Sequence, residues 1–330
     1  MLVLTKSVLA LMIGFILAII CGLITVPLLK KLKVKQKISI FLNKSHKNKD
    51  GVPTMGGIIF IIPTILTTLI LLLLNKIEFS QNLLIILFVF IGYASLGFID
   101  DFIIIKKGKN EGLTEIQKLF GQLVIAIIFF FLFLKCGHET VLNIHTLNIK
   151  VDMGWIYGLF LLFVLVASSN AVNITDGLDG LAGGLSAIAF LAFGIISWGS
   201  TWALGHEEIA IFCFILVGSL LGFLVFNTNP AKVFMGDTGS LSLGATLASV
   251  AILTNHEITL IIVAGLFVIE TLTCIIQTIS MVCFHKKVFL MTPIHHHFEK
   301  MGFKETDIVK GFWVVGLILS MCGILFGVWL

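Results

Sequence analysis

Charged residues are scarce in this chain of 330 residues, and arginine is missing altogether. Charged side chains make up 12% of the sequence, whereas soluble globular proteins carry about 25%. Hydrophobic residues make up 58%, and the mean hydropathy is +1.10. A soluble protein needs more polar surface than such a composition supplies. The sequence therefore excludes an ordinary soluble fold and predicts a chain that lies in a lipid bilayer.

Cysteine is also sparse, and no two of the six cysteines have CxxC spacing. We therefore expect neither a disulfide framework nor a cysteine-bound metal. The net charge of +4 is too small to favour nucleic acid as a partner. The first apolar run is too long for a signal-peptide core and lacks a small-residue cleavage site, so we expect it to form a mature helix.

Ten apolar runs approach the roughly 20 residues that a helix needs to cross a bilayer. They cover residues 8–29, 56–74, 82–99, 116–135, 154–172, 180–198, 209–226, 239–254, 258–283 and 309–329. These runs are continuous and not alternating, which favours helices over the strands of a barrel. The predicted fold class is an all-α polytopic membrane protein with about ten transmembrane helices in a single domain, residues 1–330. A small hairpin is expected within residues 136–152.

The lysines are distributed unevenly between the two sides of this predicted bundle. Of 22 lysines, 18 lie in or beside the loops that follow the odd-numbered runs, and four lie on the opposite side. Cytoplasmic loops carry an excess of basic residues. The sequence therefore predicts that these loops are cytoplasmic and that both termini are external.

Four polar clusters lie on the predicted cytoplasmic side, and the first is the pair Asp100-Asp101. Two adjacent carboxylates at the end of an apolar helix are unfavourable, because the helix C-terminus disfavours negative charge. A divalent cation would offset this penalty. The alternative is a solvated loop in which Lys106 and Lys107 act as counter-ions.

The second cluster lies between the fifth and sixth runs. Its members recur at every third position: Asn170, Asn173, Asp176 and Asp179. A continuous helix would place them along one stripe, but Gly177 and Gly180 favour a break. Two asparagines within an apolar helix end favour a functional site; an ordinary Gly/Asp turn is the alternative.

The third and fourth clusters contain Asp237 and a run of three histidines. Asp237 lies just before the eighth run, where a simple helix cap is the alternative role. His295, His296 and His297 follow the ninth run. Three adjacent histidines cannot all face one way, so a three-histidine zinc site is not expected. Protonated histidine binds phosphate oxygens, and histidine transfers protons; solvated loop histidines are the alternative.

The predicted starts of three helices add a geometric argument. Residues 54–57, 176–180 and 236–239 are glycine-rich and lie at the cytoplasmic side. Glycine permits close backbone approach, and helix N-termini favour phosphate. Together with the carboxylates they predict an active site at the cytoplasmic face, with Mg²⁺ bridging a pyrophosphate. Elsewhere, Glu270 is expected to satisfy a neighbouring helix or to mark a kink, and His256 and Glu257 are expected to be solvated.

These motifs resemble the polyprenyl-phosphate N-acetylhexosamine-1-phosphate transferase superfamily over nearly the whole chain. The matching segments are residues 53–57, 97–101, 170–180, 229–240 and 293–299. The last segment is similar to the muramoyl branch and not to the GlcNAc-1-phosphate branch. The resemblance implies ten helices, Mg²⁺, a homodimer and a place in the bacterial inner membrane. It implies transfer of phospho-MurNAc-pentapeptide from UDP-MurNAc-pentapeptide to undecaprenyl phosphate, which gives lipid I and UMP in peptidoglycan synthesis.

The resemblance also implies roles for individual residues. Asp237 matches the metal-ligating aspartate, Asp100 and Asp101 match the catalytic acid pair, and residues 295–297 match the histidines of the catalytic loop. The substrate-binding residues that we predict are Lys49, Thr54, Asn170, Asn173, Asp176, Gly177, Leu178, Asp179, Asn227 and Phe234. The chain departs from the superfamily in having isoleucine where basic residues are usual, at Ile104 and Ile116. The lysines that could replace them are Lys106, Lys107 and Lys118.

Three alternative functions stay open at this point. A GlcNAc-1-phosphate transferase would use the same chemistry on another sugar. An ion-coupled transporter would use Glu270, but transporters place their binding groups near the bilayer midplane between internal repeats, and this sequence has no evident repeat. A purely structural membrane protein would leave the four polar clusters without a role.

Overall fold

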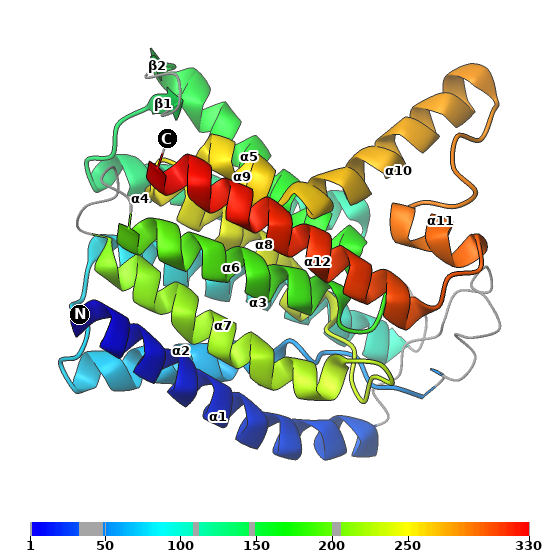
Figure 1. Cartoon of the computed structure of the whole chain (residues 1–330), viewed down its shortest axis with the longest axis horizontal. Helices are drawn as coiled ribbons and strands as arrows, with labels where there is room; N and C mark the ends of the chain where they lie inside the picture. The colour runs from blue at the N-terminus through cyan, green and yellow to red at the C-terminus, as the bar shows by residue number, and fades with distance from the viewer. Residues whose placement is uncertain are drawn as a thin grey trace.

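The computed structural model describes residues 2–32, 49, 51–107, 112–144, 149–199 and 206–329. These residues form twelve α-helices and one two-stranded hairpin (Figure 1). The helices are α1 (Leu2–Lys31), α2 (Ile58–Leu73), α3 (Gln81–Lys107), α4 (Glu115–Lys135), α5 (Trp155–Thr175), α6 (Leu181–Gly199), α7 (Glu207–Asn227), α8 (Gly236–Leu253), α9 (Glu257–Val263), α10 (Gly265–Phe284), α11 (Ile294–Lys300) and α12 (Glu305–Ile324). A single π-helical stretch, η4 (Leu325–Trp329), follows α12. The predicted helical architecture is thus confirmed.

Eight of the described helices are long and apolar enough to cross a membrane, and the chain is a multi-pass membrane protein. They are α1, α3, α4, α5, α6, α7, α10 and α12. The prediction of ten spans also included α2 and α8. With 16 residues and a rise of about 1.5 Å per residue, α2 covers about 24 Å, whereas the hydrocarbon core is about 30 Å thick. The many Gly, Ser and Thr residues of α8 lower its hydropathy.

The small residues of α8 are explained by its position in the middle of the bundle (Figure 1). Every residue from Thr238 to Leu253 is buried, and α8 packs against both α3 and α5. Membrane helices associate through small side chains that let their backbones approach closely. This central helix therefore meets protein on all sides, and its first turn, which carries Asp237, lies at one end of the bundle.

The ninth predicted span, residues 258–283, is divided into two helices. The break lies at Ala264, between α9 and α10. Beyond it α10 leaves the bundle obliquely, and the chain then returns through α11 to α12 (Figure 1). The kink is therefore at Ala264 and not at Glu270, which lies six residues further along, within α10.

A small hairpin lies at the end of the bundle opposite α11. Strands β1 (Val141–Ile144) and β2 (Ile149–Asp152) pair antiparallel, with Val141 opposite Asp152. This confirms the hairpin expected within residues 136–152. Both ends of the chain lie at this same end of the bundle (Figure 1). The polar clusters that precede α6, α8 and α12 are therefore gathered at the other end.

Candidate active site

Helices α3 and α8 approach each other closely at Gly97. A Cβ atom on Gly97 would overlap the carbonyl oxygen of Asp237, so only glycine permits this contact. The sequence predicted that Asp100 and Asp101 lie at the end of a helix. Because α3 continues to Lys107, they lie within it instead. Both carboxylates are 3% exposed, which contradicts the solvated-loop alternative.

Asp101 caps the N-terminus of α8 from the neighbouring helix. Its Oδ2 accepts hydrogen bonds from the backbone N–H of Thr238 at 2.9 Å and from the Thr238 hydroxyl at 2.6 Å, and its Oδ1 accepts from the backbone N–H of Asp237 at 3.3 Å. The first N–H groups of a helix have no partner within the helix, and a carboxylate there is favourable. Asp101 thus fixes the start of α8 against α3.

Asp237 lies in the first turn of α8, and its side chain does not cap its own helix. Its Oδ1 accepts a hydrogen bond from Nδ2 of Asn173 at 2.8 Å, and its Oδ2 accepts one from Nζ of Lys118 at 2.5 Å. The Asn173 amide also donates to Ser240 at 2.9 Å. The alternative role of Asp237 as a simple cap is therefore wrong, because its carboxylate faces α4 and α5.

Lys118 joins the two acidic positions. Its Nζ lies 2.5 Å from Asp237 and 3.5 Å from Oδ2 of Asp100. A capping box formed by Thr114 and Gln117 starts α4 and directs its first turn toward these acids. Of the three lysines considered as replacements for the superfamily's basic residues, Lys118 is the one that contacts the acids. Ile116, at one of the departing positions, is 80% exposed.

The turn between α5 and α6 brings two further carboxylates to this end of the bundle. Helix α5 ends at Thr175, so the predicted break before Gly177 is confirmed. The backbone N–H of Gly180 donates to Oδ1 of Asn227 at 3.1 Å, and the Asn227 amide donates to the carbonyl of Val233 at 2.9 Å. Asn227 thereby holds the turn against the segment that leads into α8.

Asp176, in this turn, interacts electrostatically with Asp237 and Asp101. Burial raises the pKa of Asp176 to about 7, and the carboxylates of Asp237 and Asp101 add to the rise. Since nearby negative charges disfavour a further carboxylate, this end of the bundle favours a cation or a proton. Such a cluster of carboxylates suits a divalent metal ion that also binds the phosphate groups of a ligand.

The segment before α2 lies beside the start of α8. Backbone N–H groups of Gly56 and Phe234 donate to the carbonyls of Phe234 and Pro53, both at 2.8 Å. Thr54 is 2% exposed, and its hydroxyl has no hydrogen-bond partner among the described residues. Unpaired buried polar atoms are uncommon in proteins. The predicted convergence of the starts of α2 and α8 is thus observed, with an orphaned hydroxyl beside Gly236.

A cleft of about 580 Å³ lies beside this cluster, which is within the usual size range of small-molecule sites, about 300–1,000 Å³. Nζ of Lys49 lies 2.7 Å from Asp179 and 2.6 Å from Glu305, the first residue of α12. Asn229 donates to the second oxygen of Asp179 at 3.0 Å. Lys49 and Asp179 were predicted from the sequence. Glu305 was not, because its partners lie far away in the sequence, the nearest of them, Asn229, by 76 residues.

The three histidines face three different partners, as expected for adjacent residues. His295 is fully buried and contacts Glu270 at 3.0 Å. His296 contacts Glu299 at 2.6 Å, and the Nδ1 atom of His297 accepts a hydrogen bond from the backbone of Leu290 at 3.1 Å. Of the three, His295 lies against the turn between α5 and α6, because its Nε2 contacts the position of Gly177.

Several predicted substrate-binding residues have contacts that belong to the framework of the site. The amide of Asn170 donates to Oε1 of Gln122 at 3.0 Å, across the interface of α4 and α5. Leu178 is 3% exposed and belongs to the apolar core, whereas the Phe234 side chain is partly exposed. The structure therefore brings the predicted residues to one end of the bundle, but not all into contact with each other.

The donor chemistry of Asp237 and Asp100 fits Mg²⁺ better than a metal enclosed by protein alone. Within the part of the chain that the structure describes, no three His, Cys, Asp or Glu side chains come together closely enough to hold a metal. Mg²⁺ commonly binds one or two carboxylates and takes its other ligands from water and substrate phosphates. Two carboxylates that already share one ammonium group satisfy that requirement.

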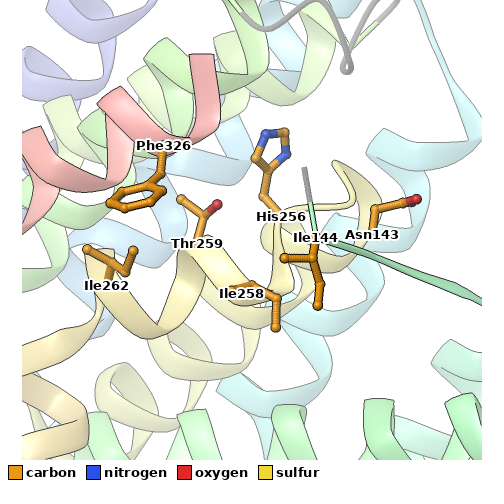
Figure 2. A pocket seen from close by; sticks show the side chains of 7 residues that line it. All are labelled: Asn143, Ile144, His256, Ile258, Thr259, Ile262 and Phe326. Atoms are coloured by element: carbon orange, nitrogen blue, oxygen red, sulfur yellow. The ribbon is translucent and has the colours of Figure 1, made fainter. Parts of the chain in front are cut away.

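A second pocket lies at the opposite end of the bundle, between β1, α9 and the π-helical stretch η4 (Figure 2). Its volume is about 20 Å³, which is room for a water molecule but not for a nucleotide. His256 and Glu257 are 1% and 3% exposed here, so the expectation that they are solvated is wrong. Glu257 accepts a hydrogen bond from the buried hydroxyl of Tyr157.

Known proteins match this chain over long segments of its sequence. A family model described as glycosyl transferase family 4 matches residues 83–255. Phospho-N-acetylmuramoyl-pentapeptide-transferase from Geobacillus sp. (strain WCH70) is 49% identical over 323 residues, which is 98% of either chain. The protein of the same name from Bacillus subtilis (strain 168) is 46% identical over 319 residues, 97% of either chain.

These matches show the family to which the chain belongs. The family model covers just over half of the chain, including the segments that carry Asp100, Asp176 and Asp237, and defines a membrane-embedded glycosyl transferase of family 4. The relatives extend the match over both the Lys49 segment and the histidine loop. The chain belongs to the phospho-N-acetylmuramoyl-pentapeptide-transferase family.

Proposed function

We propose that this chain transfers phospho-MurNAc-pentapeptide from UDP-MurNAc-pentapeptide to undecaprenyl phosphate, with lipid I and UMP as the products. The proposal is supported by relatives that bear this enzyme's name and match the chain over nearly its full length. The GlcNAc-1-phosphate alternative has no such support, and the transporter alternative loses its argument because Glu270 is paired with His295.

The observation that carries the proposal is the meeting of Asp237 and Asp100 at the ammonium group of Lys118. Carboxylates from two helices that are far apart in the sequence hold one positive charge at one end of a membrane bundle. Transfer of a phosphoryl group depends on positioning and on neutralising charge at the phosphate oxygens. An arrangement of acids around a cation therefore matches the chemistry that the family name implies.

We propose that Asp237, with Asp100 beside it, holds Mg²⁺. When bound there, Mg²⁺ would neutralise charge on the diphosphate of the nucleotide substrate. Lys118 supplies a fixed positive charge between the same two carboxylates. Asp101 acts through its hydrogen bonds to the first turn of α8, which fix the orientation of Asp237.

The proposed reaction is a direct displacement. An oxygen of the lipid phosphate attacks the phosphorus that is linked to the sugar, a new P–O bond forms, and the bond to the UMP oxygen breaks. A phosphate monoester has a second pKa near 6 and is largely ionised at pH 7, so the attack needs little help from a base. Asp100 is proposed as that base or as the group that orients the lipid phosphate.

The remaining predicted residues are assigned to substrate binding. The cleft that contains Lys49 and Asp179 is proposed to receive part of UDP-MurNAc-pentapeptide. The other proposed substrate-binding residues are Thr54, Asn170, Asn173, Asp176, Gly177, Leu178, Asn227 and Phe234. His295, His296 and His297 are proposed to act in catalysis, with His295 nearest to the turn that carries Asp176.

The site is proposed to open at the cytoplasmic face of the bacterial inner membrane. The support is the excess of lysine in the loops at this end of the bundle and the water-soluble nature of the nucleotide substrate. With both termini at the opposite end, the termini would be external. The ten-span count and the homodimer stay predictions.

The experiment is an assay of UMP release by the purified chain in lipid that contains undecaprenyl phosphate. UDP-MurNAc-pentapeptide should give Mg²⁺-dependent UMP release and a new lipid-linked product, whereas UDP-GlcNAc should give neither. Equal or faster turnover of UDP-GlcNAc would overturn the assignment. Uptake of the soluble substrate by sealed vesicles without the lipid would favour a transporter instead.

A further inference from the structure

Glu270 and His295 form a fully buried pair that joins α10 to α11. Both side chains are 0% exposed, and Nδ1 of His295 lies 3.0 Å from Oε1 of Glu270. The second carboxylate oxygen accepts the backbone N–H of His295 at 3.5 Å. Two contacts from one carboxylate therefore fix both the backbone and the ring of His295, across a separation of 25 residues.

The pairing determines which ring nitrogen carries the proton. An ionised carboxylate only accepts hydrogen bonds, so the Nδ1 atom that faces Glu270 must donate. The hydrogen bond that one ring nitrogen makes determines whether the other nitrogen carries a proton, and it also fixes the orientation of the ring. Nε2 is then the atom that His295 presents on the side away from Glu270.

Nε2 of His295 is buried but has no hydrogen-bond partner within the described residues. It faces the turn between α5 and α6, since a Cβ atom on Gly177 would overlap it. The next residue toward α5 is Asp176, which interacts electrostatically with Asp237. A buried polar atom without a partner is unfavourable unless something satisfies it. The turn beside Nε2 is part of the proposed substrate site.

We propose that Glu270 is a positioning residue: it holds the proton on Nδ1 of His295 and so directs the unprotonated Nε2 to accept a hydrogen bond from a hydroxyl group of the bound diphosphate-sugar substrate. This inference rests on the proposed function and adds a residue that the sequence left without a catalytic role. Carboxylates that orient a histidine ring in this manner contribute strongly to catalysis without touching the substrate.

The neighbouring histidines do not share the arrangement of His295, in which a carboxylate of another helix accepts a hydrogen bond from Nδ1. His296 pairs with Glu299 on its own helix, three residues away, so this contact does not connect α11 to α10. His297 accepts a hydrogen bond from Leu290 at Nδ1 and is not protonated there. The pair with Glu270 is thus the contact that sets the ring of His295 against the core of the bundle.

The first test compares Glu270→Gln with Glu257→Gln. The amide has one oxygen, for which Nδ1–H and the backbone N–H of His295 compete, so its NH₂ group forces the wrong ring tautomer in part of the molecules. Glu257 is also a buried glutamate bonded to one ring, that of Tyr157, at the opposite end of the bundle. We expect Glu270→Gln to lower kcat by about 100-fold, with KM for UDP-MurNAc-pentapeptide within about threefold. Glu257→Gln should leave kcat within about twofold.

The second test measures the proton itself by NMR of protein labelled with ¹⁵N-histidine. The His295 signals are identified by their loss in His295→Asn. We expect a protonated Nδ1 in the wild type and loss of that state in Glu270→Gln. An unprotonated Nδ1 in the wild type, or a kcat loss in Glu270→Gln no larger than in Glu257→Gln, would overturn the inference. A wild type that transfers no sugar phosphate would refute the proposed function instead, while the NMR measurement would still decide the pairing.

Discussion

Thr238 donates two hydrogen bonds to one carboxylate oxygen of Asp101, from its backbone N–H at 2.9 Å and from its hydroxyl at 2.6 Å. The first turn of α8 is thereby held by a residue of α3, and Asp237 projects from that turn. Two acids of the site therefore have separate roles: Asp101 supports the first turn of α8, and Asp237 faces the proposed metal.

The cap predicts that Asp101→Asn lowers both stability and activity. The amide keeps one acceptor oxygen and places an NH₂ group against donors, so we expect a loss of about 0.5–2 kcal/mol, the range measured for removal of a helix cap. Thermal unfolding in detergent measures this loss, and Thr238→Val, which removes the hydroxyl donor alone, should show a smaller decrease. An Asp101→Asn protein as stable as the wild type would contradict the capping role.

Asp237→Asn should lower activity strongly while leaving stability almost unchanged. The side chain keeps its size, and its remaining oxygen can still accept from Asn173 or Lys118, so the unfolding temperature should change little. Because the proposed metal ligand loses its charge, turnover should fall by about a thousandfold or more. The measurement is UMP release across a titration of Mg²⁺. Activity that survives in Asp237→Asn at saturating Mg²⁺ would refute the metal role.

Lys118→Ala tests which lysine takes the place of the superfamily's basic residue. The ammonium group lies between Asp237 and Asp100, so its removal should lower kcat/KM by about 100-fold. The double variant Lys106→Ala/Lys107→Ala is the matched control, because both side chains are exposed; it should stay within about threefold of the wild type. Equal losses in the two variants would show that general positive charge, and not the position of Lys118, is what matters.

Asp176→Asn should stabilise the protein while impairing it. Burial and neighbouring carboxylates raise the pKa of Asp176 to about 7 from its ordinary value of 3.8. The folded state therefore binds the Asp176 proton more tightly than the unfolded state, and it loses stability as the pH rises from about 4 to about 7. Asparagine resembles the protonated acid and avoids this loss. The advantage of the variant should grow over that interval and be largest at pH 8.

Thermal unfolding of wild type and Asp176→Asn at pH 5 and pH 8, in buffer with EDTA, measures this difference. We expect the variant to unfold several degrees higher at pH 8, with a smaller gap at pH 5. In a separate assay with Mg²⁺ and without EDTA, it should turn over more slowly at both pH values. A gap that is the same at the two pH values would mean that Asp176 does not titrate in this range.

Hydropathy predicted the helices well where they face lipid, and less well where they face protein. Helix α8 is surrounded by other helices, so it is built from small residues and scarcely resembles a membrane span. The end of α3 was placed too early because the acids at 100 and 101 look like a boundary. In the folded protein Asp101 is bonded to the start of α8, and Asp100 contacts Leu113 and Lys118 at the start of α4. No local pattern reveals these contacts.

The candidate site was predicted by residue type, but its connections were not. Aspartates and histidines in glycine-rich segments stand out in an apolar sequence, so Asp237 and His295 could be selected. Their partners could not, since Lys118 is 119 residues from Asp237 and Glu270 is on a different helix from His295. Glu270 looked like a packing residue because its ring partner follows a long loop. Contacts of this kind depend on the tertiary fold alone.

The close contact between Gly97 and the carbonyl of Asp237 leaves no room for a side chain at position 97. Position 97 has no side chain and performs no chemistry, yet an added methyl group there would wedge α3 away from α8 and pull Asp100 out of reach of Lys118. Substitutions on the apolar face of α3 should therefore inactivate the enzyme as readily as substitutions of its acidic residues. A screen for loss of cell-wall synthesis would recover such alleles, and an inhibitor that levered these two helices apart would need no resemblance to a nucleotide.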